Sequence, residues 1–191
     1  MKILKKSLLL LIITLSLTSL GQKRVSFDKL TKKGDIMYYE NNLFTGIAFN
    51  ICPNSEQLDF ENYYKDGKKH GIQKSWYENG QLMFKLNFKD GEYDGLSLWY
   101  YKNGQLWIEW NFKDGKQNGL SKMYYENGQL KFEENYKEFE LNGLHKEWYE
   151  NGQLKYKLNY KDGKRNGLQK GWYENGQFEF EVNYKNGVII D

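Results

Sequence analysis

Cysteine and histidine, which supply cross-links, metal ligands and catalytic groups, are scarce in this chain, and so is proline. The 191 residues include one cysteine, one proline and two histidines. Because Cys52 is the only cysteine, an internal disulfide is excluded, and the fold must be stable without covalent cross-links. A single proline, together with 17% aromatic residues, argues against a proline-rich disordered chain and favours a β-sheet protein.

Long hydrophobic runs are also missing, except near the N-terminus. Residues 1–21 begin with a lysine-rich stretch and continue with an apolar run over residues 7–20, and Ser19 and Gly21 offer small side chains for cleavage before Gln22. The run is shorter than the roughly 20 apolar residues that span a bilayer. We expect a cleaved secretory signal peptide, an exported protein (periplasmic, cell-surface or secreted) and no stable transmembrane segment after cleavage. A retained N-terminal anchor is the alternative.

An excess of positive charge is absent once that segment is removed. Residues 1–21 contain three lysines and no acidic residue, so the remainder has 25 basic and 25 acidic residues. Nucleic-acid-binding domains usually carry a basic patch or a high net positive charge. The composition therefore predicts no nucleic-acid partner.

What the chain does contain is a repeat with a fixed step of 24 residues. The tripeptide Asn-Gly-Gln begins at Asn79, Asn103, Asn127, Asn151 and Asn175. A second glycine series with the same step comprises Gly71, Gly95, Gly119, Gly143 and Gly167. A period of this size is typical of repeat arrays, in which each unit packs mainly on its neighbours. Such arrays usually function through a surface built by repetition.

Each unit is predicted to be a β-hairpin. In residues 71–94, Asn79-Gly80 is a strong signal for a type I′ turn, and Asp90-Gly91 reverses the chain again. Two strands and two turns per unit predict an antiparallel meander. The expected fold class is all-β, an elongated meander of repeated 24-residue β-hairpins that forms an open repeat sheet.

Apolar and polar residues alternate along these predicted strands, which is typical of a sheet with one buried face. The pattern places Ile72 and Trp76 on the apolar face before the turn, and Leu86 on it after the turn. Gln73 and Ser75 have the opposite parity and are expected on the polar face.

The two ends of the array are irregular. We interpret residues 46–191 as the repeat domain, with a degenerate first unit, and residues 22–45 as an N-terminal tether and lead-in strand. Residues 22–35 are polar and unpatterned, so they are expected to form a loose tether, and the lead-in strand is expected from Tyr38 to Phe44.

One internal unit departs from the pattern. Glu138-Phe139 stands where the other units have Asp-Gly or Asn-Gly, although the length of the segment is unchanged. We expect a different turn there, with Phe139 and Leu141 exposed. Drift in a tolerant loop and contact with a partner are the two interpretations.

Aromatic residues recur in columns along the array. Cross-strand packing explains such columns, because aromatic pairs stabilise sheets. Stacked rings can also bind a protein partner, quaternary ammonium groups or sugars. The candidate partner-binding residues are Trp76, Tyr77, Tyr100, Tyr101, Tyr124, Tyr125, Phe139, Trp148, Tyr149, Trp172 and Tyr173.

No catalytic, cofactor-binding or metal-binding group is predicted. His70 and His145 occupy different repeat positions and have no cysteine or helical spacing to support a metal site. The Asp-Gly and Asn-Gly turns are rich in oxygen ligands, but turn formation explains the same residues without Ca²⁺. No serine has a neighbouring histidine, and no glycine-rich phosphate loop opens a helix.

Several spaced elements recur together in residues 149–176, in the order Tyr-Glu-Asn-Gly-Gln-Leu, Asn-Tyr-Lys-Asp-Gly-Lys, Asn-Gly-Leu and Trp-Tyr-Glu-Asn-Gly. This pattern resembles the MORN repeat variant, over about residues 46–187. Bacterial arrays of this kind are similar to the YwqK family, described as the antitoxin component of a toxin–antitoxin pair. The resemblance implies elongated hairpin sheets used for protein–protein and sometimes lipid contact, and it implies no catalytic residues.

The sequence therefore predicts a non-enzymatic, exported repeat scaffold that binds another protein. Two alternatives are an antitoxin whose partner is a toxin, and an aromatic repeat module that binds cell-wall carbohydrate or choline.

Overall fold

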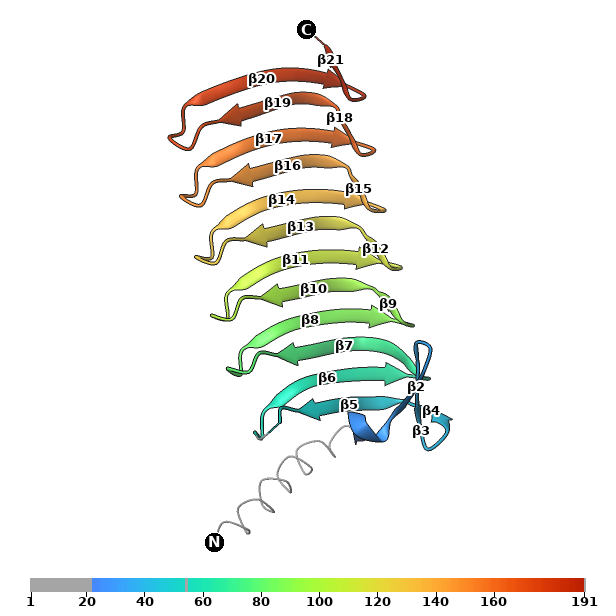
Figure 1. Ribbon diagram of the computed structural model, residues 1–191. Helices are drawn as coiled ribbons and strands as arrows, with labels where there is room; N and C mark the ends of the chain where they lie inside the picture. The colour runs from blue at the N-terminus through green and yellow to red at the C-terminus, as the bar shows by residue number, and fades with distance from the viewer. Residues whose placement is uncertain (1–21, 54, 191) are drawn as a thin grey trace.

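The computed structural model describes residues 22–53 and 55–190, and the signal peptide predicted for residues 1–21 lies outside them. One sheet of 18 strands contains all the repeats, and a second sheet of three strands lies near the N-terminal end. Figure 1 shows the hairpins stacked in chain order into one long layer, with strands β5 and β21 at opposite ends of the stack. The predicted all-β open meander is confirmed.

Each unit contributes two main strands. The first strands of the units are β5 (Gly46–Ile51), β7 (Lys68–Trp76), β10 (Gly95–Tyr100), β13 (Gly119–Tyr124), β16 (Gly143–Trp148) and β19 (Gly167–Trp172). The second strands, each of eight residues, are β6 (Leu58–Lys65), β8 (Leu82–Lys89), β11 (Leu106–Lys113), β14 (Leu130–Lys137), β17 (Leu154–Lys161) and β20 (Phe178–Lys185). Neighbouring strands pair antiparallel, both within a hairpin and between units.

Short strands complete the two sheets. After the second turn of each unit come β9 (Glu92–Tyr93), β12 (Lys116–Gln117), β15 (Glu140–Leu141), β18 (Lys164–Arg165) and β21 (Val188–Ile190). The N-terminal segment forms β1 (Arg24–Ser26), the 3₁₀ turn η2 (Phe27–Lys29), β2 (Thr31–Lys33), β3 (Ile36–Tyr39) and β4 (Asn42–Leu43).

The type I′ turn predicted at Asn-Gly is wrong. Gly80 has φ +86°, but Asn79 does not have a positive φ. The Gly80 N–H donates to the Tyr77 carbonyl at 2.9 Å, and the Tyr77 N–H donates to the Gln81 carbonyl at 2.8 Å. These bonds close a three-residue loop. Its first two residues, Glu78 and Asn79, do not have positive φ, and they are followed by a glycine in the left-handed region.

The type I′ geometry lies at the other turn of the unit. Asp90 and Gly91 have φ of +53° and +97°, and the Asp-Gly pairs of the other units repeat these values closely. The different turn expected at Glu138-Phe139 is also wrong, since these residues have φ of +50° and +73°. Glu138 and Phe139 therefore both adopt the left-handed conformation, although Phe139 stands at the position that is glycine in the other units.

A β-bulge follows each Asn-Gly loop and resets the register. Trp76 pairs with Leu82, but the preceding Ser75 pairs with Phe84, so Met83 is left without an opposite residue. The same shift occurs in the four later hairpins. A bulge puts two residues of one strand opposite one of its partner and changes which side chains share a face.

The bulge overturns the predicted distribution of faces. Gln73 pairs with Leu86, so both side chains point to the same face, and Gln73 is 1% exposed. Ile72 pairs with Asn87 on the opposite face and is 41% exposed. We call the first side the aromatic face, defined by Phe84, Leu86, Phe88 and their equivalents in the other units.

Small polar residues of the first strands are buried on the aromatic face between larger side chains. Ser97 and Ser121 are fully buried. The Gln73 amide donates to the Tyr63 carbonyl at 2.8 Å, and the Gln169 amide donates to the Asn159 carbonyl at 3.0 Å. Because these buried amide nitrogens are hydrogen-bonded, the sheet tolerates the glutamines, and the small serines leave room for the rings of the second strands.

The loose tether predicted for residues 22–35 is not what the structure shows. β1 pairs in parallel with β5, where Val25 lies opposite Ala48. Val25, Met37 and Phe44 are at most 6% exposed and form a hydrophobic cluster with Ala48 and Tyr64. The N-terminal segment contributes isolated apolar residues to this cluster, so its sequence shows no periodic pattern.

Candidate functional site

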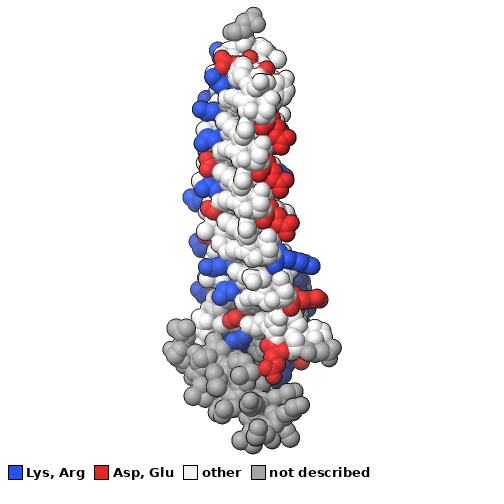
Figure 2. All heavy atoms as spheres, turned by 90° about the vertical axis from the view of Figure 1, so that its left-hand side faces the viewer, with Lys and Arg blue, Asp and Glu red and all other residues white. Residues whose placement is uncertain are grey.

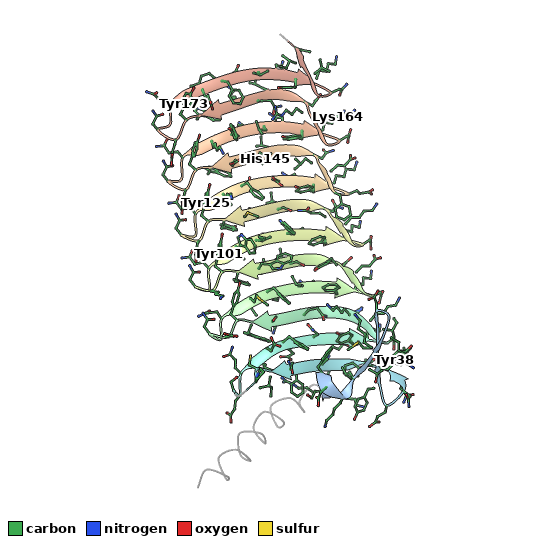
Figure 3. The ribbon with its side chains drawn as sticks, viewed as in Figure 1. Tyr38, Tyr101, Tyr125, His145, Lys164 and Tyr173 are labelled. Carbon is green, nitrogen blue, oxygen red and sulfur yellow. The ribbon has the colours of Figure 1, made fainter. Side chains whose placement is uncertain are left out.

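The edge of the array formed by the Asn-Gly loops holds one set of predicted binding residues, the tyrosines that open these loops. Figure 3 shows Tyr101, Tyr125 and Tyr173 along this edge and Lys164 on the opposite one. The hydroxyl of each of the first four tyrosines donates to a backbone carbonyl 23 residues later, in the next unit. The bonds are Tyr77 to Tyr100 (2.8 Å), Tyr101 to Tyr124 (2.8 Å), Tyr125 to Trp148 (2.9 Å) and Tyr149 to Trp172 (3.0 Å).

The environment of these tyrosines favours the protonated hydroxyl. Burial, and secondarily the carboxylates of Glu126 and Glu150, raise the pKa of Tyr101. The hydroxyl therefore remains a donor over the whole neutral range. Tyr173, in the last described loop, has no such acceptor among the described residues and is 50% exposed.

The asparagines of the Asn-Gly loops form a second ladder beside the tyrosines. The Asn79 side-chain oxygen accepts from the Gln81 N–H at 3.1 Å, and its amide donates to the Lys102 carbonyl of the next loop at 2.8 Å. The pattern is repeated three times further along, with amide bonds of 3.0–3.2 Å. One side chain therefore shapes its own loop and fastens the loop that follows.

Glutamine and glycine complete this contact between loops. A Cβ atom at Gly104 would lie 2.8 Å from Oε1 of Gln81, and equivalent close approaches occur at the three later loops. The glycine thus provides both the left-handed backbone and space for the previous glutamine. All three residues of Asn-Gly-Gln therefore have a structural reason to recur.

The neighbouring column of aromatic residues packs across the hairpins. Its members are partly buried and lie opposite Leu82 or its equivalents. In the last hairpin the Trp172 and Phe178 rings meet edge to face at 6.3 Å. The column consists of Trp76, Tyr100, Tyr124, Trp148 and Trp172.

The tyrosines that bond the next unit, Tyr77, Tyr101, Tyr125 and Tyr149, are called the ladder tyrosines below. Lysines at the bulge positions lie over two of their rings. The Lys131 ammonium lies 5.5 Å from the Tyr125 ring centroid, and the Lys155 ammonium lies 5.5 Å from that of Tyr149. These are internal cation–π contacts on rings that a sugar or a quaternary ammonium ligand would otherwise use.

Charge is divided between the two sides of the Asn-Gly edge. Figure 2 faces this edge and shows basic side chains mainly along one side, acidic ones mainly along the other, and uncharged atoms between them. The tyrosine that opens each Asn-Gly loop is followed by an exposed charged residue. In chain order these residues are Glu78, Lys102, Glu126, Glu150 and Glu174. The edge is therefore polarised without a large net charge.

Phe139 is a predicted site residue that lies apart from the Asn-Gly loops, and its backbone N–H donates to the Gln117 carbonyl at 3.0 Å. It lies in the type I′ turn after β14 and is 57% exposed. Its φ of +73° belongs to the left-handed region, where a bulky side chain is a genuine outlier. Beside it, Lys116 Nζ and Glu138 Oε2 form an ion pair at 3.3 Å.

The aromatic face also contains a charged group that was not among the predicted site residues. His145 Nδ1 lies 3.0 Å from Oε1 of Glu134, and both side chains are only 12–13% exposed. Burial would raise the pKa of Glu134, but hydrogen bonds from His145 and Tyr136 hold it below its usual value. Burial and the bond to Glu134 raise the pKa of Tyr136. Glu134 occupies the column of Leu86 and Leu158, and this break in the column is the signal that could have revealed it.

Within residues 22–53 and 55–190, no three His, Cys, Asp or Glu side chains come together as a metal-binding group. His70 instead contacts the Asp90 carboxylate at 3.3 Å. The same residues contain no helix long and apolar enough to cross a membrane.

Comparison with protein families identifies the repeat. A family model described as MORN repeat variant matches five segments, at residues 69–90, 93–114, 117–138, 141–162 and 165–186. Each segment contains one Asn-Gly-Gln loop and ends at the first central residue of the next type I′ turn. Together they cover more than half of the chain, and they confirm the repeat class that the sequence resembles. No curated protein matches the chain.

The tyrosine ladder predicts a difference between two matched substitutions. Tyr125→Phe removes a hydroxyl that bonds the next unit, and it should lower the free energy of unfolding by about 1 kcal/mol. Tyr173→Phe removes a hydroxyl without such an acceptor and should change it by less than about 0.5 kcal/mol. Urea unfolding measures both, and equal effects would contradict the ladder.

Backbone strain at Phe139 predicts a stabilising substitution. Phe139→Gly should raise the free energy of unfolding by about 1 kcal/mol, because glycine adopts this φ without a Cβ clash. Gly163→Ala, at the equivalent turn with φ +71° and nothing nearer than 4.0 Å to the new Cβ, should lower it by a similar amount. A neutral or destabilising Phe139→Gly would show that no strain is stored there.

The buried carboxylate predicts a pH dependence. Because the pKa of Glu134 is lowered in the folded state, its stabilising contribution is present above the pKa of an unfolded glutamate, about 4.3, and is lost as the pH falls through the lower folded value. The difference in melting temperature between the wild type and Glu134→Gln should therefore be largest near neutral pH and shrink in acid. A difference that grows in acid would contradict this assignment.

Proposed function

Because the chain belongs to the MORN repeat variant family, we propose that it is a non-enzymatic, exported scaffold that binds another protein through the turn at Glu138 and Phe139. The observation that carries the proposal is Phe139, an exposed aromatic residue held in a left-handed conformation where the other units have glycine. Exposed aromatic side chains that become buried on association are frequent binding hot spots.

The position of Phe139 on the edge supports a role as an anchor. The equivalent residues of the two neighbouring turns are Gly115 and Gly163, which have no side chains. The neighbouring turns therefore carry no side chain at the position that Phe139 occupies. A partner with an apolar pocket could bury the ring without meeting a neighbouring side chain at those two positions.

Energetics argue against an accidental phenylalanine. A left-handed non-glycine residue costs roughly 1–2 kcal/mol, and a single substitution to glycine would remove that cost. Strain of this kind is often retained at functional sites. The Lys116–Glu138 ion pair beside the ring supplies a polar rim, which is typical of the surroundings of a hot spot.

Other candidate surfaces have less support. The ladder tyrosines bond the next unit, and lysines lie over two of their rings, so binding of sugars or choline there would have to displace internal contacts. The antitoxin role implied by the YwqK resemblance is a special case of the proposal, in which the partner is a toxin. No contact or comparison favours a toxin over another protein.

Site-specific photo-crosslinking tests the proposed contact. A benzoylphenylalanine replacing Phe139 in the full chain, expressed in its native cells, should crosslink to one protein identified by mass spectrometry. The same probe replacing Gly115 is the matched control at an equivalent turn, and it should give little or none of that product.

The identified partner then allows a binding measurement. Phe139→Gly should weaken binding of that partner at least about tenfold, as expected for loss of an aromatic anchor, while the chain itself becomes more stable. Unchanged affinity, or crosslinking from position 115 but not from 139, would refute the proposed site. If the partner is toxic when expressed alone and harmless with this chain, the antitoxin role follows.

A further inference from the structure

A hollow of about 700 Å³ lies between the N-terminal segment and the first units of the array. Its floor is the aromatic face, with Phe60, Asn62 and Phe88, and Phe27 and Ile36 belong to its wall. The volume is within the range of about 300–1,000 Å³ that is usual for small-molecule sites. This is a second site, apart from the turn at Phe139.

The wall is fastened to the first type I′ turn of the array. The Met37 N–H donates to the Gly67 carbonyl at 2.8 Å, and the Gly67 N–H donates to the Phe44 carbonyl at 2.8 Å. A Cβ atom on Gly67 would lie 2.6 Å from Ile36 Cγ2 and 2.9 Å from the Met37 carbonyl oxygen. Because Met37 and Phe44 are also buried in the hydrophobic cluster, the wall is a fixed part of the fold.

Three carboxylates, of Asp35, Asp90 and Glu92, line the hollow together with three lysines, Lys32, Lys68 and Lys69. Asp35 contacts Lys32 at 3.9 Å, and Asp90 contacts His70 at 3.3 Å. The Glu92 carboxylate points towards the next turn, 3.3 Å from where a Cβ atom on Gly115 would be. Lysines and carboxylates are thus equal in number, but among the described residues only Lys32 pairs with one of these carboxylates within 4.0 Å.

Lys68 and Lys69 are the lining lysines without an ion pair among the described residues, and Lys69 is the one whose ammonium lies over a ring of the floor. Among the described residues it forms no ion pair within 4.0 Å, and its ammonium lies 5.1 Å from the centroid of the Phe88 ring in the floor. Partial burial, and secondarily the nearby Lys32 ammonium, lower the pKa of Lys69. An anion bound between these two ammonium groups would relieve their repulsion.

The floor offers complementary surfaces for the rest of a ligand. The Phe27 and Phe60 rings meet edge to face at 5.1 Å and form an apolar corner. Asn62 occupies the column position that is Leu86 in the next unit, and its side-chain amide makes no hydrogen bond with the described residues. The hollow thus combines aromatic rings, the Asn62 amide and the unpaired Lys69 ammonium.

We infer that this hollow binds a small aromatic organic anion, with its carboxylate or sulfonate at Lys69 and its ring against Phe60 and Phe88. The ammonium and the anion form a charge-assisted hydrogen bond, and the rings exclude water from one side of it. Asn62 can hydrogen-bond a polar substituent on the ligand ring.

Anilinonaphthalene sulfonate, whose fluorescence rises in apolar surroundings, is a suitable probe for the full chain. We expect saturable binding at one site, and Lys69→Met should weaken it about tenfold through loss of the charged partner. Arg165→Met is the matched control, because Arg165 occupies the equivalent position in a later unit but does not line the hollow. Its affinity for the probe should equal that of the wild type.

Competition on the wild-type chain tests the requirement for an anion without any substitution. Naphthalene sulfonate should displace the probe at about tenfold lower concentration than neutral naphthalene methanol, which has a ring system of the same size. Binding that does not saturate, equal losses in the two variants, or equal competition by the two naphthalenes would each overturn the inference.

Discussion

The structure depends on bonds that run from one Asn-Gly loop to the next. Beyond the N-terminal end, the described residues form no second sheet or helix on the repeat sheet, so each unit must be held by its neighbours. The tyrosine hydroxyls and asparagine amides provide this contact at a spacing of 23 residues. At the other edge, a type I′ turn donates a backbone N–H to the preceding unit, as from Gly91 to Lys69 at 2.9 Å. Each such bond contributes only about 1 kcal/mol, and the array repeats it along its length.

This constraint separates the residues that build the array from those that are available for function. Asparagine, glycine, glutamine and the ladder tyrosine recur because each contacts the next loop. Phe139 breaks the pattern in a position where the fold would favour glycine, and its side chain is 57% exposed. The hollow at the N-terminal end exists for a similar reason, because only there does a non-repeating segment lie against the aromatic face. Both proposed sites, the turn at Phe139 and the hollow, therefore lie where the repeat pattern is interrupted.

The sequence predicted the repeat, its step and its hairpins, since these follow from turn residues and from alternation along the chain. It misassigned the faces because alternation cannot reveal the bulge at Met83, and only pairing of Gln73 with Leu86 shows that a glutamine lies among the rings. It placed the type I′ turn at Asn79 because Asn-Gly suits either turn, whereas the loop closed by Tyr77 and Gln81 selects the other geometry. Val25 and Met37 were missed for a different reason, since isolated apolar residues carry no period.

The most direct test of the account is urea unfolding, followed by far-ultraviolet circular dichroism, of a chain lacking residues 95–118. This deletion removes one whole unit and leaves Tyr77 and Asn79 facing the equivalent carbonyls of the following unit. The account predicts a β-sheet spectrum and one cooperative transition at a somewhat lower urea concentration than for the full chain. A chain without a folded baseline or a cooperative transition would contradict it, because the units would then depend on contacts beyond their neighbours.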